Sequence, residues 1–310
     1  DTDFDELLNV LLKHKDYTGR HPVITAATCV ANPDYDKIHN DEFLRYSYID
    51  LRNTYLSMPQ SGNVLNKMIE AADAGVFVPE YHGREHLNVH WWLKYLQDGE
   101  ENFIKAFQSG CFMLSGGYSK KPQMGGVGAA YDMASKQELD AHIEIVKDGL
   151  RLFDDTFGYP AQYFAAPSLL YNSGMEEALS RGGIKLIDVP RFRREPLGMG
   201  KYRKKLHYQA QPAQRNQWYI TRNAVFEPDF GTGKDFISSC LNEINEAFSN
   251  RQPAVISNHR VCFMGGIEPG NREFGLKSLD QLLSDMIKRW PDLEFISVRD
   301  LLKEYINAES

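Results

Sequence analysis

Residues 76–86, VFVPEYHGREH, contain the pattern that decides the fold. The segment starts with a short apolar, β-branched run at 76–78 and ends in a cluster of ionisable side chains. In the stretch that follows, 87–97, the apolar residues recur at the spacing of one helical face. An apolar run, a polar loop and an amphipathic stretch, in this order, predict one βα unit.

The same unit recurs along the chain and predicts a mostly parallel sheet, because strands that alternate with helices run in one direction. Such a sheet either closes into a barrel or stays open with helices on both faces. The predicted strands lie at 23–30, 76–78, 162–165, 184–189, 218–221, 254–257 and 293–298. The predicted helices lie at 64–74, 87–97, 100–109, 136–153, 174–181, 234–249, 276–289 and 298–305.

The composition is that of a soluble globular protein, with 42% hydrophobic and 25% charged residues among 310. One α/β barrel accommodates this length, so we expect a single domain over 1–310. Two stretches, 116–134 and 190–215, are polar, rich in Gly, Pro and basic residues, and fit no predicted element. We expect both to be long loop insertions that form lids or substrate walls.

Charge and cysteine content exclude several classes of partner. The formal net charge of -7 argues against nucleic acid, although the basic residues of 191–205 would suit an anionic sugar if they are more than a solvated loop. No apolar run approaches the roughly 18 residues of a membrane helix, so no membrane partner is expected. The four cysteines are widely spaced and no signal peptide is visible, which favours free thiols in the cytoplasm. The oligomeric state stays open.

Ionisable side chains follow the predicted strands, where parallel α/β folds gather their reactive groups. His82 and His86 are four residues apart, so on a helix they would share one face and converge on one metal ion. His90 continues the series, but about 12 Å of helix would separate it from His82. The competing interpretation is a pair of helix-start histidines satisfied by backbone and solvent.

Two imidazoles leave a metal ion short of ligands, and a carboxylate from a neighbouring strand end would complete the set. Asp34, in the turn after the first predicted strand, is the predicted third ligand, with Asp36 as the alternative. An ordinary Asn-Pro-Asp turn also explains Asp34. The predicted cofactor is one divalent ion, with zinc favoured and cobalt, manganese or nickel compatible.

His259 and Asp188 are the predicted catalytic residues. His259 follows the strand predicted at 254–257, and an imidazole that titrates near neutrality can protonate a leaving group. Asp188, near the end of the strand predicted at 184–189, is a candidate to orient His259. Each also has a structural explanation, because loop histidines are often structural and an Asp close before Pro is common in turns.

Taken in order, these motifs resemble the polysaccharide deacetylase family, the NodB homology domain. His82-Gly-Arg-Glu-His86 matches the family's His-x-x-x-His metal motif. Residues 157–168, FGYPAQYFAAPS, resemble the approach to its Arg-x-Pro loop, and 255–259, VISNH, resemble the strand that ends in its catalytic His. The resemblance covers residues 23–259. It implies a deformed (β/α) barrel of about seven parallel strands, an Asp-His-His metal site and a carbohydrate substrate.

The chain departs from the family at two linked positions. Asn32 replaces the Asp that serves as base, and Ala165 replaces the Arg that steadies that base. We expect a divergent metal-dependent hydrolase that removes acyl groups from an N- or O-acylated carbohydrate, with Asp36, Glu80, Glu85 or a metal-bound hydroxide as base. The alternatives are a catalytically silent carbohydrate- or metal-binding protein and a hydrolase of other non-peptide C–N bonds.

Overall fold

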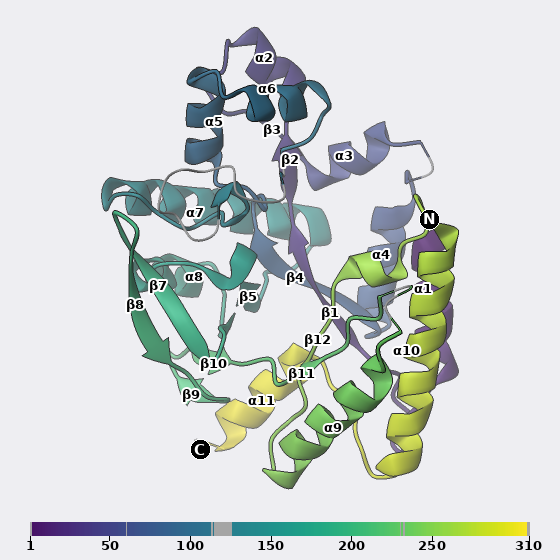
Figure 1. Ribbon diagram of the computed structural model, residues 1–310. Helices are drawn as coiled ribbons and strands as arrows, with labels where there is room; N and C mark the ends of the chain where they lie inside the picture. The colour runs from purple at the N-terminus through teal and green to yellow at the C-terminus, as the bar shows by residue number, and fades with distance from the viewer. Residues whose placement is uncertain are drawn as a thin grey trace. The chain divides into compact units, whose positions relative to one another are not determined.

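A computed structural model describes residues 2–59, 61–112, 114, 126–229, 231 and 233–308 (Figure 1). The chain divides into two compact units, each built from segments that are distant in sequence. Unit 1 comprises Asp1–Ala26, Pro59–Pro79 and Thr221–Ser310. Unit 2 comprises Ala27–Met58 and Glu80–Ile220.

A six-stranded sheet has the strand order β1-β4-β5-β6-β10-β9, and its strands β5, β6, β10 and β9 belong entirely to unit 2. Strands β4, β5, β6 and β10 are parallel, and β9 pairs antiparallel with β10. The prediction of a mostly parallel α/β sheet is therefore confirmed. The bounds are β1 (Ile24–Cys29), β4 (Phe77–Gly83), β5 (Tyr163–Ala165), β6 (Leu186–Asp188), β10 (Trp218–Ile220) and β9 (Gln211–Pro212).

The predicted closed barrel of seven strands is not confirmed, because this sheet has a linear order that ends at β1 and β9. The prediction of a strand at 293–298 is wrong. Residues 293–297 have no regular structure, and helix α11 (Val298–Ala308) begins directly after them. Their apolar residues Leu293 and Phe295 are buried in the core of unit 1 without pairing as a strand.

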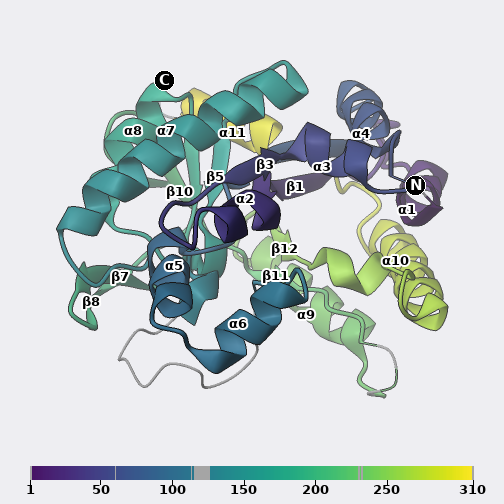
Figure 2. The same cartoon turned by 90° about the horizontal axis from the view of Figure 1, so that it is seen from above.

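The predicted helices of unit 2 are present, and their periodicity buries one face of each. Helix α7 (Gln137–Phe157) buries Val146, Leu150 and Phe153 at helical spacing and ends at Gly158, whose φ of 76° only glycine adopts readily. It runs alongside α8 (Glu176–Arg181) (Figure 2). The other predicted helices of this unit are α5 (Val89–Gln97) and α6 (Glu101–Gln108). Two short helices that were not predicted, α2 (Tyr35–Asn40) and α3 (Leu51–Ser57), accompany the antiparallel pair β2 (Ala31–Pro33) and β3 (Tyr48–Asp50).

The stretch 190–215, predicted as a loop insertion, instead forms an antiparallel hairpin of β7 (Phe192–Gly198) and β8 (Lys201–Leu206). Buried and exposed residues alternate along β7, as in a strand. The sequence does not show this two-residue period as an alternation of apolar and polar residues, because many of the side chains are Lys or Arg. In the other predicted insertion, residues 126–128 form a short 3₁₀ turn. Residues 116–125 lie outside the described residues.

Unit 1 is built on helices that pack around one apolar core. Helix α1 (Thr2–Lys13), which the sequence analysis missed, packs against α10 (Pro269–Arg289), and Leu11 and Leu282 are buried in that core (Figure 1). The unit also contains α4 (Val64–Asp73), α9 (Phe236–Ser249) and α11, and the parallel pair β11 (Ala224–Val225) and β12 (Ile256–Ser257).

Within the part of the chain that the structure describes, no helix has the length and apolarity to cross a membrane.

Candidate functional site

His82 and His86 come together at the carboxyl end of β4. His82 belongs to the strand and His86 to the following loop, before α5 begins at Val89, so the prediction that both lie on one helical face is wrong. Their rings are nevertheless close, with centroids 5.1 Å apart and planes at 58°. A strand followed by a sharp loop, and not a helical turn, produces this proximity.

The His82 ring is oriented by the neighbouring strand. Its Nδ1 lies 2.7 Å from the main-chain oxygen of Ala165 on β5. Because a carbonyl oxygen only accepts, Nδ1 carries the proton and Nε2 of the neutral ring carries the lone pair. Metal-ligating histidines are held in this way, with the second ring nitrogen bonded to a carboxylate or carbonyl. His82 is therefore suited to bind a metal through Nε2.

A buried ion-pair network holds the loop between the two histidines. Arg84 Nε donates to Glu85 at 2.7 Å, and Arg84 Nη1 donates to Asp148 on α7 at 3.0 Å. The Arg84 guanidinium also lies 4.6 Å from the ring centroid of Tyr48. Burial raises the pKa of the Glu85 carboxyl, while Arg84 pulls that pKa down. A movement of the loop would separate these partners and leave a charge buried without its counter-charge. The network therefore holds the loop in one conformation.

Gly83 allows the chain to turn sharply between the histidines. Its φ is 126°, a conformation that side-chain-bearing residues rarely adopt. A Cβ atom there would lie 3.0 Å from the Tyr131 hydroxyl oxygen and 3.2 Å from the Glu85 main-chain oxygen. Both the backbone angle and the close packing thus require glycine.

Two of the carboxylates predicted as candidate bases, Glu80 and Glu85, form contacts that stabilise the fold. Glu80 is fully buried, and its Oε2 accepts hydrogen bonds from the main-chain N–H groups of Gln162 and Tyr163 at 2.8 and 3.0 Å. These bonds join β4 to the start of β5. Glu85 pairs with Arg84, whereas Asp36 is exposed on α2.

Asp34 serves as the N-cap of α2. Its Oδ1 accepts from the main-chain N–H of Lys37 at 3.0 Å, and its Oδ2 lies 3.1 Å from the Lys37 ammonium. Among the residues that the structure describes, no group of three or more His, Cys, Asp or Glu side chains is placed to hold a metal ion. The structure therefore does not assemble Asp34 with His82 and His86 as one ligand set.

Asp188 lies at the end of β6 and is buried. Its Oδ2 accepts a hydrogen bond of 2.5 Å from the Tyr163 hydroxyl on β5. This bond links two neighbouring parallel strands on one face of the sheet.

His259 belongs to unit 1, where a carboxylate that the sequence analysis missed holds it. Glu227 Oε1 lies 2.7 Å from His259 Nδ1, and Glu227 Oε2 accepts a hydrogen bond from the Cys262 thiol at 3.3 Å. The His259 side chain is 74% exposed. Glu227, and not the predicted Asp188, is therefore the carboxylate that contacts His259 Nδ1 and orients the ring.

Strand register builds the His259–Glu227 pair. Strands β11 and β12 are parallel, with Val225 opposite Ser257. Glu227 and His259 each lie two residues beyond these partners, so both side chains leave the same end of the strand pair. An equal offset from paired strands is the signal that would have identified Glu227, but β11 was not among the predicted strands.

Two solved structures resemble the chain weakly. One is a GH57 branching enzyme from the hyperthermophilic archaeon Thermococcus kodakaraensis, with a TM-score of 0.40 and 11% identity over 79% of this chain and 50% of the enzyme. Another is the alpha-amylase AmyC from Thermotoga maritima, with a TM-score of 0.32 and 8% identity over 78% of this chain and 59% of the amylase.

The chain spans between half and three fifths of the length of these two structures. Both proteins are carbohydrate-processing enzymes, but likenesses this weak carry no argument about the function of this chain. No family model matches the chain, and no curated protein matches it significantly.

Proposed function

We propose that this chain is a metal-dependent hydrolase that removes acyl groups from an N- or O-acylated carbohydrate. The observation that carries the proposal is the His82–His86 pair at the end of β4, with rings 5.1 Å apart and His82 oriented by the Ala165 carbonyl. The order of motifs over residues 23–259 supports acylated carbohydrate as the substrate class.

The two imidazoles fit a divalent ion that accepts nitrogen ligands, such as zinc, cobalt, nickel or manganese. An ion bound by His82 and His86 would polarise an acyl carbonyl and activate a water molecule. Asp34 is the proposed third ligand. This role requires its carboxylate to give up the contacts with Lys37 that cap α2.

His259 is the proposed proton donor to the departing amine or alcohol. Glu227 holds Nδ1 and thereby orients the ring, and the side chain is accessible because it is 74% exposed. With Nδ1 held by the carboxylate, Nε2 is the ring nitrogen that would exchange the proton with the substrate. The assignment rests on this pair and on the position of His259 in the motif order.

A second candidate is a catalytically silent protein that binds a carbohydrate or a metal ion. Asn32 favours this candidate, because its side chain donates a hydrogen bond to Thr54 at 3.3 Å and offers no carboxylate to deprotonate water. A third candidate, a hydrolase of other non-peptide C–N bonds, would use the same two histidines.

Metal analysis tests the site itself. Purified protein should retain about one equivalent of a divalent ion per chain, measured by inductively coupled plasma mass spectrometry. The His82→Ala/His86→Ala variant should lose this ion while its circular dichroism spectrum stays that of folded protein. His90→Ala is the matched control, because this exposed histidine lies on α5 outside the pair. Undiminished metal content in the double variant would refute the site.

Substrate assays separate the three functions. Metal-loaded protein should release acetate from acetylated xylo-oligosaccharides or N-acetylated amino sugars, and the double histidine variant should not. Saturable oligosaccharide or metal binding without acetate release would identify the silent protein. Turnover confined to a panel of non-carbohydrate amides would identify the third candidate.

A further inference from the structure

The β7–β8 hairpin has one buried face and one exposed face. Side chains alternate along β7, so that Arg193 is buried while its neighbours Phe192 and Arg194 are exposed. The register places Phe192 opposite Leu206 and Arg194 opposite Lys204. Directly paired residues share a face of a hairpin. The exposed face therefore carries an apolar pair next to a basic pair.

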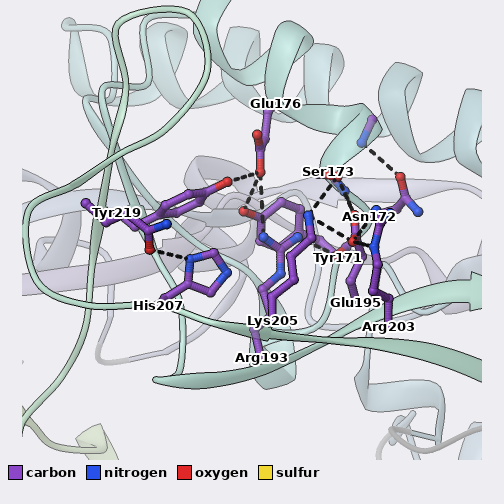
Figure 3. A network of polar contacts seen from close by, with 12 residues as sticks. Tyr171, Asn172, Ser173, Glu176, Arg193, Glu195, Arg203, Lys205, His207 and Tyr219 are labelled. Atoms are coloured by element: carbon purple, nitrogen blue, oxygen red, sulfur yellow. Dashed lines mark hydrogen bonds and ion pairs between the residues drawn. The ribbon is translucent and has the colours of Figure 1, made fainter.

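Buried polar contacts fix the inner face of the hairpin (Figure 3). The Arg193 guanidinium lies 3.7 Å from the Tyr171 ring centroid, donates to the Tyr171 main-chain oxygen at 2.8 Å and faces Glu176. Glu195 accepts a hydrogen bond from the main-chain N–H of Ser173 at 2.8 Å. Rotating the hairpin would leave these charges buried without partners, so its outer face is held in one orientation.

The hairpin is strongly basic within an acidic chain. Residues 191–206 contain seven of the 35 Lys and Arg residues but only one of the 42 acidic residues. This segment is therefore positively charged, although the whole chain has a formal net charge of -7. The acidic residue, Glu195, is buried and forms ion pairs with Arg203 and Lys205. Arg194 on β7 and its directly paired partner Lys204 on β8 are both exposed. This surface complements an anionic partner.

Large apolar side chains are exposed on the same hairpin. Phe192 and Leu206 are directly paired across the two strands, whereas Leu197 and Met199 lie near the turn that joins them. Adjoining exposed apolar side chains mark an interaction surface, because single exposed apolar residues are common but adjoining ones are not. The exposed fractions are 75% for Phe192, 46% for Leu197, 79% for Met199 and 60% for Leu206.

We propose that the exposed face of the β7–β8 hairpin docks on an anionic phospholipid surface. The basic side chains would contact the headgroups, and the apolar side chains would enter the boundary between headgroups and acyl chains. A soluble polyanion would satisfy only the charges, whereas a lipid surface satisfies both. The expectation of no membrane partner rested on spanning helices, which this mode of binding does not need. The proposal is independent of the proposed hydrolase function.

Vesicle co-sedimentation of the full chain tests the charge component. The protein should bind vesicles that contain phosphatidylglycerol, bind vesicles of phosphatidylcholine alone far less, and dissociate as salt rises. Arg194→Glu/Lys204→Glu, which changes the basic pair of the exposed face, should weaken binding by roughly 30-fold or more, from roughly fivefold for each basic residue near an anionic surface. Lys277→Glu/Lys288→Glu on α10, with the same charge change, is the control and should bind as the unmodified protein does.

A fluorescent reporter tests the apolar component. The tryptophan emission of Met199→Trp should shift to the blue on vesicles that contain phosphatidylglycerol, and Phe192→Ser should weaken binding. Soluble dextran sulfate distinguishes the other partner class. Tight binding to dextran sulfate without any blue shift on vesicles would overturn the proposal, as would equal binding of the Arg194→Glu/Lys204→Glu variant and its control.

Discussion

Glu227 Oε1 lies 2.7 Å from His259 Nδ1, and the same carboxylate accepts a hydrogen bond from Cys262. The carboxylate of Glu227 thus lies next to Nδ1 of an exposed imidazole. A ring held in this way has a defined orientation, which a proton donor requires.

His259→Ala should lower turnover on any substrate of the protein by about a hundredfold or more, as expected for loss of a general acid. Glu227→Gln should cause a smaller loss, because the amide oxygen still accepts a hydrogen bond from Nδ1 but carries no charge. Metal content should stay unchanged in both variants. Cys262→Ser is the control and should retain turnover; full activity of His259→Ala would remove this residue from the mechanism.

The unmodified protein should be a weak catalyst on N-acetylated chitin-type oligomers. In the proposed hydrolase, Asn32 replaces the carboxylate that would act as base, and general-base assistance contributes about 10²- to 10⁴-fold. Acetate release, measured with an enzyme-coupled assay, should therefore fall well below the rates of about 1 to 10³ per second that enzymes ordinarily reach. Asn32→Asp should raise the rate. An ordinary rate without that substitution would show that another group acts as base.

Gly83→Ala should destabilise the protein by about 1 to 3 kcal/mol, because the backbone there has a φ of 126° and the new Cβ atom would meet Tyr131 and Glu85. The same change should lower metal affinity, since Gly83 lies between His82 and His86. Urea unfolding and metal titration measure the two effects. Gly62→Ala is the control, because nothing lies within 4 Å of a Cβ atom there; equal behaviour of the two variants would contradict the assignment.

Glu195 should make stability depend on pH below neutrality. Burial alone would raise the pKa of its carboxyl, but hydrogen bonds from Ser173, Lys205 and Arg203 hold the pKa at about 2, against 4.5 for an ordinary Glu. The pKa is lowered by folding, so the stabilisation is complete above pH 4.5 and is lost as pH falls toward 2.

The difference between the ordinary and the folded-state pKa of Glu195 corresponds to about 3 kcal/mol of folding free energy at neutral pH. In urea unfolding series from pH 7 down to pH 3, the gap in free energy of unfolding between unmodified protein and Glu195→Gln should be widest at neutral pH and should narrow as the solution becomes acidic. A gap that stays constant over this range would show that the ion pairs do not stabilise the hairpin.

Local sequence was enough to predict the longer helices. The amphipathic spacing of α7 and α9 is contained in neighbouring residues, so the pattern predicts the buried face without knowledge of the fold. It was not enough for β11, which was not predicted, or for the pairing of β11 with β12. These strands are two residues long each, and their pairing depends on main-chain hydrogen bonds between segments about thirty residues apart.

The sequence by itself identified His82 and His86 as a pair, because residue type and a spacing of four residues limit where they can lie. It supplied the wrong local geometry, since a strand and a loop, and not a helix, carry them. Only the tertiary structure decided that Ala165 orients His82 and that Glu227 holds His259. Hydrogen bonds of about 2.7 Å depend on strand register and side-chain direction, which residues distant in sequence acquire only when the chain has folded.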